Sequence, residues 1–92
     1  MKVRWLRVAL AQLEREAVVI AGDDPKAAAA MLTRVFEAAE GLAQFPAMGR
    51  VGRVAGTREQ VVPGTPYILP YRVREQQVEI LRFLHGARKW PP

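Results

Sequence analysis

The chain has 92 residues and a mass of 10.3 kDa, enough for one small domain and too little for two independent hydrophobic cores. Half of the residues are apolar and a quarter are charged, a balance that excludes a disordered chain. The absence of Cys and the single His exclude disulfides, a thiolate nucleophile and Cys or His metal clusters, and no cofactor is expected. No apolar run approaches the roughly 20 residues that span a bilayer, so a cytoplasmic protein is expected.

The net charge of +5 is unevenly distributed along the chain. Residues 1–45 carry six basic and six acidic side chains, whereas residues 46–92 carry eight basic and three acidic ones. Seven of those eight are Arg, whose forked guanidinium suits phosphate and carboxylate groups. The C-terminal half is therefore expected to bind an anionic partner, with an ordinary solvated basic face as the alternative.

The first half of the chain predicts two helices joined by a tight turn. Apolar residues recur every three or four positions from residue 6 to 20 and again from 28 to 42, which is the period of a helix with one buried face. Asp24 and Pro25 suit the N-cap and the first turn of the second helix. The pattern predicts a helical hairpin over about residues 6–45.

A loop is expected after the second helix. Pro46 disfavours helix at Phe45, so the helix should end there. Residues 46–56 contain three Gly and one Pro, too many for a regular element, and they carry Arg50 and Arg53.

The remaining segments predict a small antiparallel sheet. The hydrophobic period changes to two after residue 56, and three strands are expected at residues 57–62, 67–74 and 77–84. Together they form a β-meander over about residues 57–85, followed by a short basic tail at 86–92. Residues 2–5 alternate polar and apolar and could add a fourth strand. The order β-α-α-β-β-β predicts an α+β fold with both helices on one face of a mainly antiparallel sheet.

The other face of this sheet is predicted to lack a cover. In the middle strand Ile68 and Arg72 point to this face, opposite the core side. In the last strand Val78, Ile80 and Arg82 share one side. If Arg82 lies on the same side as Arg72, the open face carries arginines among exposed apolar residues, as in a protein-binding groove.

Four segments of the chain resemble the RelE/ParE family of toxins. They are Pro46–Arg50, Gly56–Glu59, Pro66–Val73 and Val78–Arg88, and the order of elements agrees over essentially the whole chain. The resemblance implies a toxin of a type II toxin–antitoxin pair, neutralised by an antitoxin that lays an acidic segment over it. The residues expected to contact that antitoxin are Ile68, Arg72, Val78, Ile80 and Arg82.

The family resembled here divides by target. ParE-like members inhibit DNA gyrase, and RelE-like members cleave messenger RNA on the ribosome. This chain has Ile68 where RelE-like nucleases usually carry Arg, and Leu84–Gly86 where several carry a C-terminal Tyr. These departures favour a ParE-like gyrase inhibitor without enzymatic activity. A ribosome-dependent endonuclease is the alternative, and its catalytic residues would be His85, Arg58 and Arg82.

Several residues have a structural as well as a functional interpretation. His85 is an acid or base in the endonuclease hypothesis, and otherwise a strand-end residue with a structural hydrogen bond. Glu59 is better explained by a cross-strand ion pair than by a role as base. Four aromatic residues fall at core positions: Trp5, Tyr67, Tyr71 and Phe83.

The loop and the tail supply candidates for contact with the cellular target. These are Arg50, Arg53, Arg88, Lys89 and Trp90. For Arg50 and Arg53, simple solvation is an equal alternative. Trp90 could fold back on the sheet or insert into a partner, and the sequence leaves both open.

Overall fold

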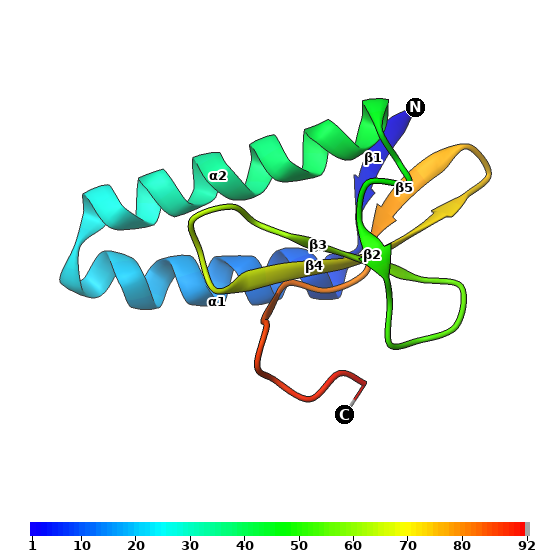
Figure 1. Cartoon of the computed structure of the whole chain (residues 1–92). Helices are drawn as coiled ribbons and strands as arrows, with labels where there is room; N and C mark the ends of the chain where they lie inside the picture. The colour runs from blue at the N-terminus through cyan, green and yellow to red at the C-terminus, as the bar shows by residue number, and fades with distance from the viewer. Residues whose placement is uncertain (92) are drawn as a thin grey trace.

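The structure is a computed structural model that describes residues 1–91. Its elements follow the chain from the N-terminal strand to the C-terminal tail (Figure 1). In order they are β1 (Lys2–Trp5), α1 (Arg7–Asp23), α2 (Pro25–Gln44), β2 (Arg50–Val51), β3 (Arg58–Val61), β4 (Tyr67–Arg74), β5 (Gln77–Ile80) and β6 (Leu84–His85).

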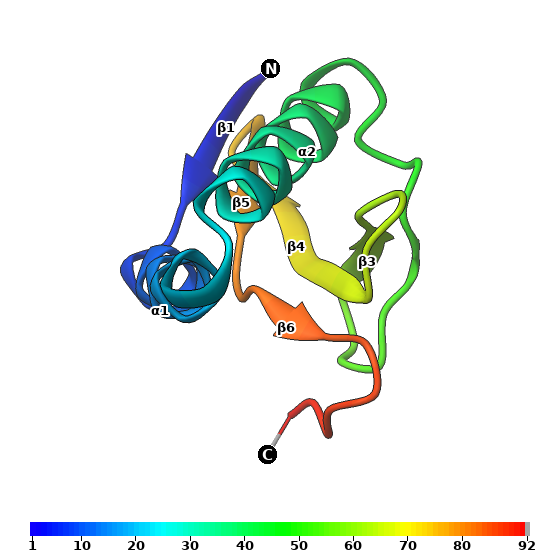
Figure 2. The ribbon, with the colours of Figure 1, turned by 90° about the vertical axis from the view of Figure 1, so that its left-hand side faces the viewer.

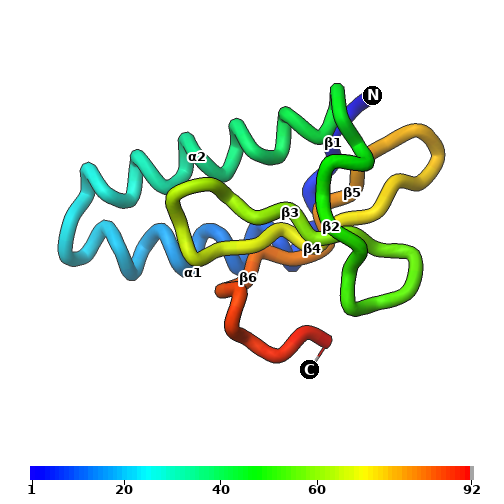
Figure 3. Tube along the Cα trace, in the orientation of Figure 1, coloured from blue at the N-terminus to red at the C-terminus, as the bar shows by residue number. Residues whose placement is uncertain are grey.

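The strands form one sheet in the order β1-β5-β4-β3-β2, and β6 pairs with β4 beyond the end of β5. Figure 3 traces the chain through these elements from the N-terminus to the C-terminus. β1 runs parallel to β5, and the other pairs are antiparallel. The predicted α+β class and element order are confirmed. Two strands were not predicted: β2 lies inside the expected loop 46–56, and the expected strand 77–84 is divided into β5 and β6.

The helical hairpin follows the predicted turn chemistry. The backbone N–H of Ala27 donates to the Asp24 carboxylate over 3.1 Å, and Pro25 occupies the first turn of α2. α2 ends at Gln44, as the proline at position 46 requires. α1 continues through Gly22 to Asp23, so it is longer than the apolar periodicity predicted.

The core lies between the helices and one face of the sheet (Figure 2). Ala9 and Leu13 of α1 and the buried face of α2 pack on residues of β4 and β5. The aromatic residues predicted for the core are there: Tyr71 and Phe83 are buried, and Trp5 and Tyr67 pack half-buried at its margin.

A β-bulge opposite Pro70 sets which residues face the core. The Pro70 carbonyl accepts hydrogen bonds from the N–H groups of Leu81, at 2.8 Å, and Arg82, at 3.4 Å. Tyr71 pairs with Ile80, and Ile68 pairs with Leu84. The chain that runs from β5 to β6 therefore contains one residue more than the stretch of β4 opposite it. Proline has no N–H to donate to the neighbouring strand, which explains why pairing is interrupted at this point.

The bulge overturns part of the predicted open face. Val78 and Ile80 point into the core and are fully buried, so their predicted exposure is wrong. The extra residue reverses the alternation after Ile80, and Phe83 joins the core instead. Ile68 does lie on the face away from the helices, but it is only 3% exposed because it is covered there.

Tyr71 ties the loop after α2 to the centre of the sheet. Its hydroxyl donates to the Pro46 carbonyl over 2.7 Å and accepts from the Gly49 N–H over 2.9 Å. A Cβ at Gly49 would stand 2.6 Å from this hydroxyl, so only glycine permits the approach. Arg58 donates to the carbonyls of Gly49 and Ala47 and holds the same loop.

We expect Tyr71→Phe to lower the free energy of unfolding by about 1–3 kcal/mol, because it leaves a buried N–H and a carbonyl without their partner. Urea denaturation followed by circular dichroism measures this change. Tyr67→Phe is the matched control. Its hydroxyl bonds Glu16 in a partly exposed position, so the expected loss is below about 1 kcal/mol. Equal losses in the two variants would contradict the anchoring role of Tyr71.

Candidate functional site

The face of the sheet away from the helices carries two glutamates, each held between arginines. Glu59 is 2% exposed and forms ion pairs with Arg50, at 3.2 Å, and Arg53, at 3.4 Å. The Arg53 N–H also donates to Glu59 over 3.0 Å. Arg50 lies directly across from Glu59 in the β2–β3 pair, which confirms the predicted cross-strand ion pair. Glu59 is therefore buried and held by three contacts from Arg50 and Arg53, which is a structural role.

Glu79 is the second glutamate of this kind. It pairs with Arg72 at 2.7 Å on β4 and with Arg4 at 3.5 Å on β1. The hydrogen bond from Arg72 lowers the pKa of Glu79 below its ordinary value, against a smaller opposing effect of burial, and the charges of Arg4 and Arg74 add to the lowering. Glu79 thus remains ionised at neutral pH.

The basic face draws on both halves of the chain. In the register of the parallel β1–β5 pair, Lys2 and Arg4 lie opposite Gln77 and Glu79, so they point to the same side as Arg72. Both come from the half of the sequence whose net charge is zero. The distribution of charge along the sequence therefore predicted the basic residues that the second half gives to this face. It did not predict those of the first strand.

The part of this face nearest the C-terminus is covered, contrary to the predicted open sheet. Arg53 donates to the carbonyls of Gly86, at 3.0 Å, and Arg88, at 2.9 Å, and so ties the loop after β2 to the tail. The Gly86 N–H donates to the Pro66 carbonyl over 2.8 Å. Together these bonds hold the tail beside the start of β4.

Trp90 folds back within this tail. Its ring lies under the Arg82 guanidinium, with 5.1 Å between the guanidinium carbon and the ring centroid. The indole nitrogen is buried and has no hydrogen-bond partner among the described residues. In this structure the Trp90 ring packs within the chain against Arg82, and insertion into a partner stays a prediction.

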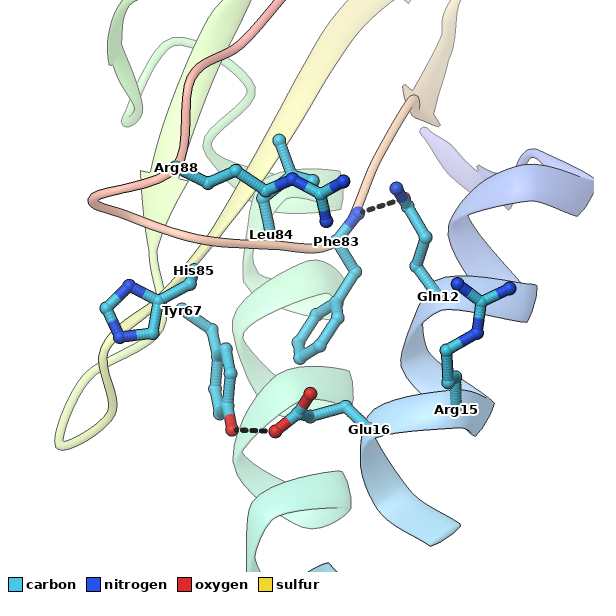
Figure 4. Close-up of a pocket in the computed structure, with 8 residues that line it drawn as sticks. All are labelled: Gln12, Arg15, Glu16, Tyr67, Phe83, Leu84, His85 and Arg88. Atoms are coloured by element: carbon cyan, nitrogen blue, oxygen red, sulfur yellow. Dashed lines mark hydrogen bonds between the residues drawn. The ribbon is translucent and has the colours of Figure 1, made fainter. Parts of the chain in front are cut away.

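A small cleft of about 150 Å³ opens between α1 and the segment after the bulge (Figure 4). Its walls come from three parts of the chain: Gln12, Arg15 and Glu16 on α1, Tyr67 on β4, and Phe83, Leu84, His85 and Arg88 near the C-terminus. Gln12 accepts a hydrogen bond from the Phe83 N–H over 3.0 Å, which fixes α1 against the chain that leaves the bulge.

Two polar groups in the cleft are occupied. The Tyr67 hydroxyl donates to the Glu16 carboxylate over 2.9 Å. Burial and the neighbouring Glu16 both raise the pKa of Tyr67, so this phenol stays protonated and cannot serve as a general base at neutral pH. His85 is exposed, and its Nδ1 accepts the Ala87 N–H over 3.2 Å, which is a structural hydrogen bond within the turn.

The three residues considered for catalysis do not form one constellation. Arg58 lies opposite Tyr71 on one edge of β4, whereas His85 lies opposite Tyr67 on the other edge. Four residues along a strand and two strand spacings separate them by about 16 Å between Cα atoms. Arg58 is bound to two loop carbonyls and Arg82 packs on Trp90.

Arg15 and Gln12 are the residues of this site that sequence reasoning missed. Both are polar residues of the first predicted helix that belong to no motif; Arg15 is exposed, and Gln12 is partly buried. Their only signal in the sequence is that they lie within one helical turn of the apolar residues of α1. The sequence does not show which strand packs beside them, because that depends on the bulge.

Two further findings concern the described residues. Between residues 1 and 91, no helix combines the length and the apolar character needed to cross a bilayer. Within the same residues, no group of three or more His, Cys, Asp or Glu side chains is placed to hold a metal ion.

Comparison with known proteins gives concordant matches over nearly the whole chain. The family model described as the ParE toxin of the type II toxin–antitoxin system parDE matches residues 3–90. A Sinorhizobium fredii protein named "Putative toxin Y4kP" is 43% identical over 90 residues, which cover 98% of this chain and 93% of the relative. "Toxin RelE2" of Caulobacter vibrioides is 37% identical, and the match covers 95% of this chain and 97% of the relative.

One solved structure supports the same assignment. It is described as the chromosomal ParDE TA system from P. aeruginosa, and one of its chains superposes with a TM-score of 0.83. The match has 25% sequence identity and covers 92% of this chain and 95% of that chain.

We expect Glu79→Gln to reduce the loss of stability in acid. The folded-state pKa of Glu79 is lowered from its ordinary 4.5, so its stabilising effect is fully present above that pH and is lost as the pH falls through the lowered value. Melting temperatures between pH 6 and pH 3 measure this change. Glu14→Gln, at an exposed position of α1, should keep the wild-type acid profile. Parallel profiles for wild type and Glu79→Gln would refute the assignment.

We expect Arg53→Ala to release the tail, because it removes both hydrogen bonds to the tail carbonyls. Hydrogen–deuterium exchange should become faster at the amides of Gly86 and Arg88, which donate to Pro66 and His85 in the folded tail. Arg50→Ala is the matched control, since Arg50 also pairs with Glu59 but makes no bond to the tail. Unchanged exchange in Arg53→Ala would show that the tail is held by other contacts.

Proposed function

Because the chain belongs to the ParE toxin family of type II toxin–antitoxin systems, we propose that it inhibits DNA gyrase by binding to it, without catalysing a reaction of its own. A toxin of this type has a cognate antitoxin as its partner. The ParDE description of the structural relative supports the choice of branch.

The observation that carries the proposal is the separation of the candidate catalytic groups. Cleavage of RNA needs a base, an acid and cationic donors around one phosphate. Here Arg58 and His85 lie on opposite edges of β4, and Tyr67, which pairs with His85, carries a phenol with a raised pKa. These positions support a toxin that acts through binding.

For the antitoxin we propose contacts at Arg72 and Arg82. Arg72 uses its Nε atom for Glu79 and has further N–H groups available, and it is partly exposed. Arg82 is partly exposed beside Trp90. Carboxylates of an acidic segment suit both guanidinium groups.

For the gyrase target we propose contacts at the exposed end of the loop and the tail. Arg50 and Lys89 are exposed, and Arg88 extends over the cleft in Figure 4. Arg53 and Trp90, also candidates, would act from their present positions, in which Arg53 holds the tail and Trp90 packs under Arg82.

The endonuclease stays as a second candidate because a close relative is named "Toxin RelE2". Purified toxin should block supercoiling by gyrase and leave the 5′ ends of messenger RNA in a translation reaction unchanged. His85→Ala should inhibit gyrase as well as the wild type does, because the His85 ring contacts the Ala87 N–H and the Tyr67 ring and is none of the proposed target contacts. Unaffected gyrase together with cleavage in phase with codons, abolished by His85→Ala, would establish the endonuclease instead.

A further inference from the structure

A second hollow of about 90 Å³ adjoins the cleft of Figure 4. The two hollows share Gln12, Leu84 and Arg88 as walls, and the second one ends at Arg82 and Trp90. We call these two adjoining hollows, between α1 and residues 82–90, the α1 groove. The chain that leaves the bulge and the tail residues Arg88, Lys89 and Trp90 form part of its walls.

The α1 groove is strongly basic. Four cationic side chains line it, which are Arg15, Arg82, Arg88 and Lys89, against the single carboxylate of Glu16. Glu16 accepts a hydrogen bond from the Tyr67 hydroxyl, so one of its carboxylate oxygens is already occupied within the groove wall. Arg15 and Arg88 are exposed, and among residues 1–91 neither guanidinium is in ion-pair contact with a carboxylate. These two guanidinium groups are therefore available to an anionic ligand.

The shape and the aromatic residues decide which anion fits. Pockets for small molecules commonly measure roughly 300–1,000 Å³, and each hollow here is smaller, so each accommodates a single side chain rather than a nucleoside. Binding of single-stranded nucleic acid relies on free aromatic faces. In the α1 groove the Trp90 ring is covered by Arg82, and the Tyr67 ring packs on Phe83 with 4.7 Å between centroids.

We propose that the α1 groove binds an acidic peptide segment of the cognate antitoxin, with one carboxylate at Arg15 and Arg88 and another at Arg82 and Lys89. The inference rests on the proposed neutralisation by an acidic segment and is independent of the identity of the target. It assigns to antitoxin binding a residue, Arg15, from the half of the sequence that has no net charge. A segment bound here also covers Arg88 and Lys89, which were proposed above as target contacts.

Calorimetric titration of the toxin with full-length cognate antitoxin tests the proposal. Arg15→Glu and Arg88→Glu should each weaken binding roughly tenfold, because a reversed charge meets a carboxylate, and the wild-type affinity should fall as salt is added. Arg7→Glu is the matched control. It lies on the same helix, is exposed and stands outside the groove, so its affinity should equal that of the wild type. Melting temperatures verify that each variant is folded.

Two further measurements make the outcome decisive. Reversing single acidic residues of the antitoxin to Lys should restore binding to Arg15→Glu at one position and not at others. Wild-type affinity in both Arg15→Glu and Arg88→Glu would overturn the proposal. So would unchanged antitoxin binding combined with lost binding of an eight-residue single-stranded oligonucleotide, which would make the groove a nucleic-acid site. The titration contains no gyrase. Its result therefore stays valid even if the toxin fails to inhibit gyrase in the supercoiling assay.

Discussion

The missing N–H of Pro70 is the constraint on which the arrangement of the C-terminal half depends. β4 is an inner strand, and proline there removes one hydrogen bond from the ladder toward the next strand. The neighbouring strand forms a bulge at this point, and the Pro70 carbonyl accepts hydrogen bonds from two of its N–H groups. Phe83 then enters the core and β6 pairs with the first residues of β4. Without this extra residue Phe83 would point away from the helices and His85 would leave the cleft.

Electrostatic pairing on the outer face follows from the same sheet. Glu59 and Glu79 are each flanked by two arginines from neighbouring strands or loops, so each cluster keeps one positive charge in excess. A buried carboxylate requires such partners because its desolvation is costly. The arginines thus stabilise the fold and at the same time leave a basic surface. For this reason, counting arginines in the sequence overestimates the number free to bind an anion.

Sequence reasoning predicted the two helices, the meander and the core aromatic residues because each depends on local periodicity or local turn chemistry. Asp24 with Pro25, and the breakers after Phe45, act within a few residues. The position of Val78 and Ile80 was predicted incorrectly because simple alternation was extended through Arg82. Pro70 was visible in the sequence, and its place in an inner strand was the signal for a bulge. The partners of Arg53 and Trp90 depend on contacts more than 30 residues apart or on the path of the tail, and no local pattern encodes those.

The candidate site was predictable to a lesser extent for a physical reason. The total charge of half of the chain predicts an anionic partner but does not predict which surface binds it. That surface combines both halves, because β1 pairs with β5 and α1 lies beside the chain after the bulge. Lys2 and Arg4 therefore join the outer face, and Arg15 joins the α1 groove. Arg82 lies between the outer face and the α1 groove. The carbon of its guanidinium lies over the Trp90 ring in the groove, and its backbone belongs to the bulge that separates β5 from β6. An acidic segment that contacts Arg82 can thus extend along the groove toward Arg15. Such a segment needs no exposed apolar strand on the toxin, so the antitoxin contacts first predicted at Val78 and Ile80 are not required.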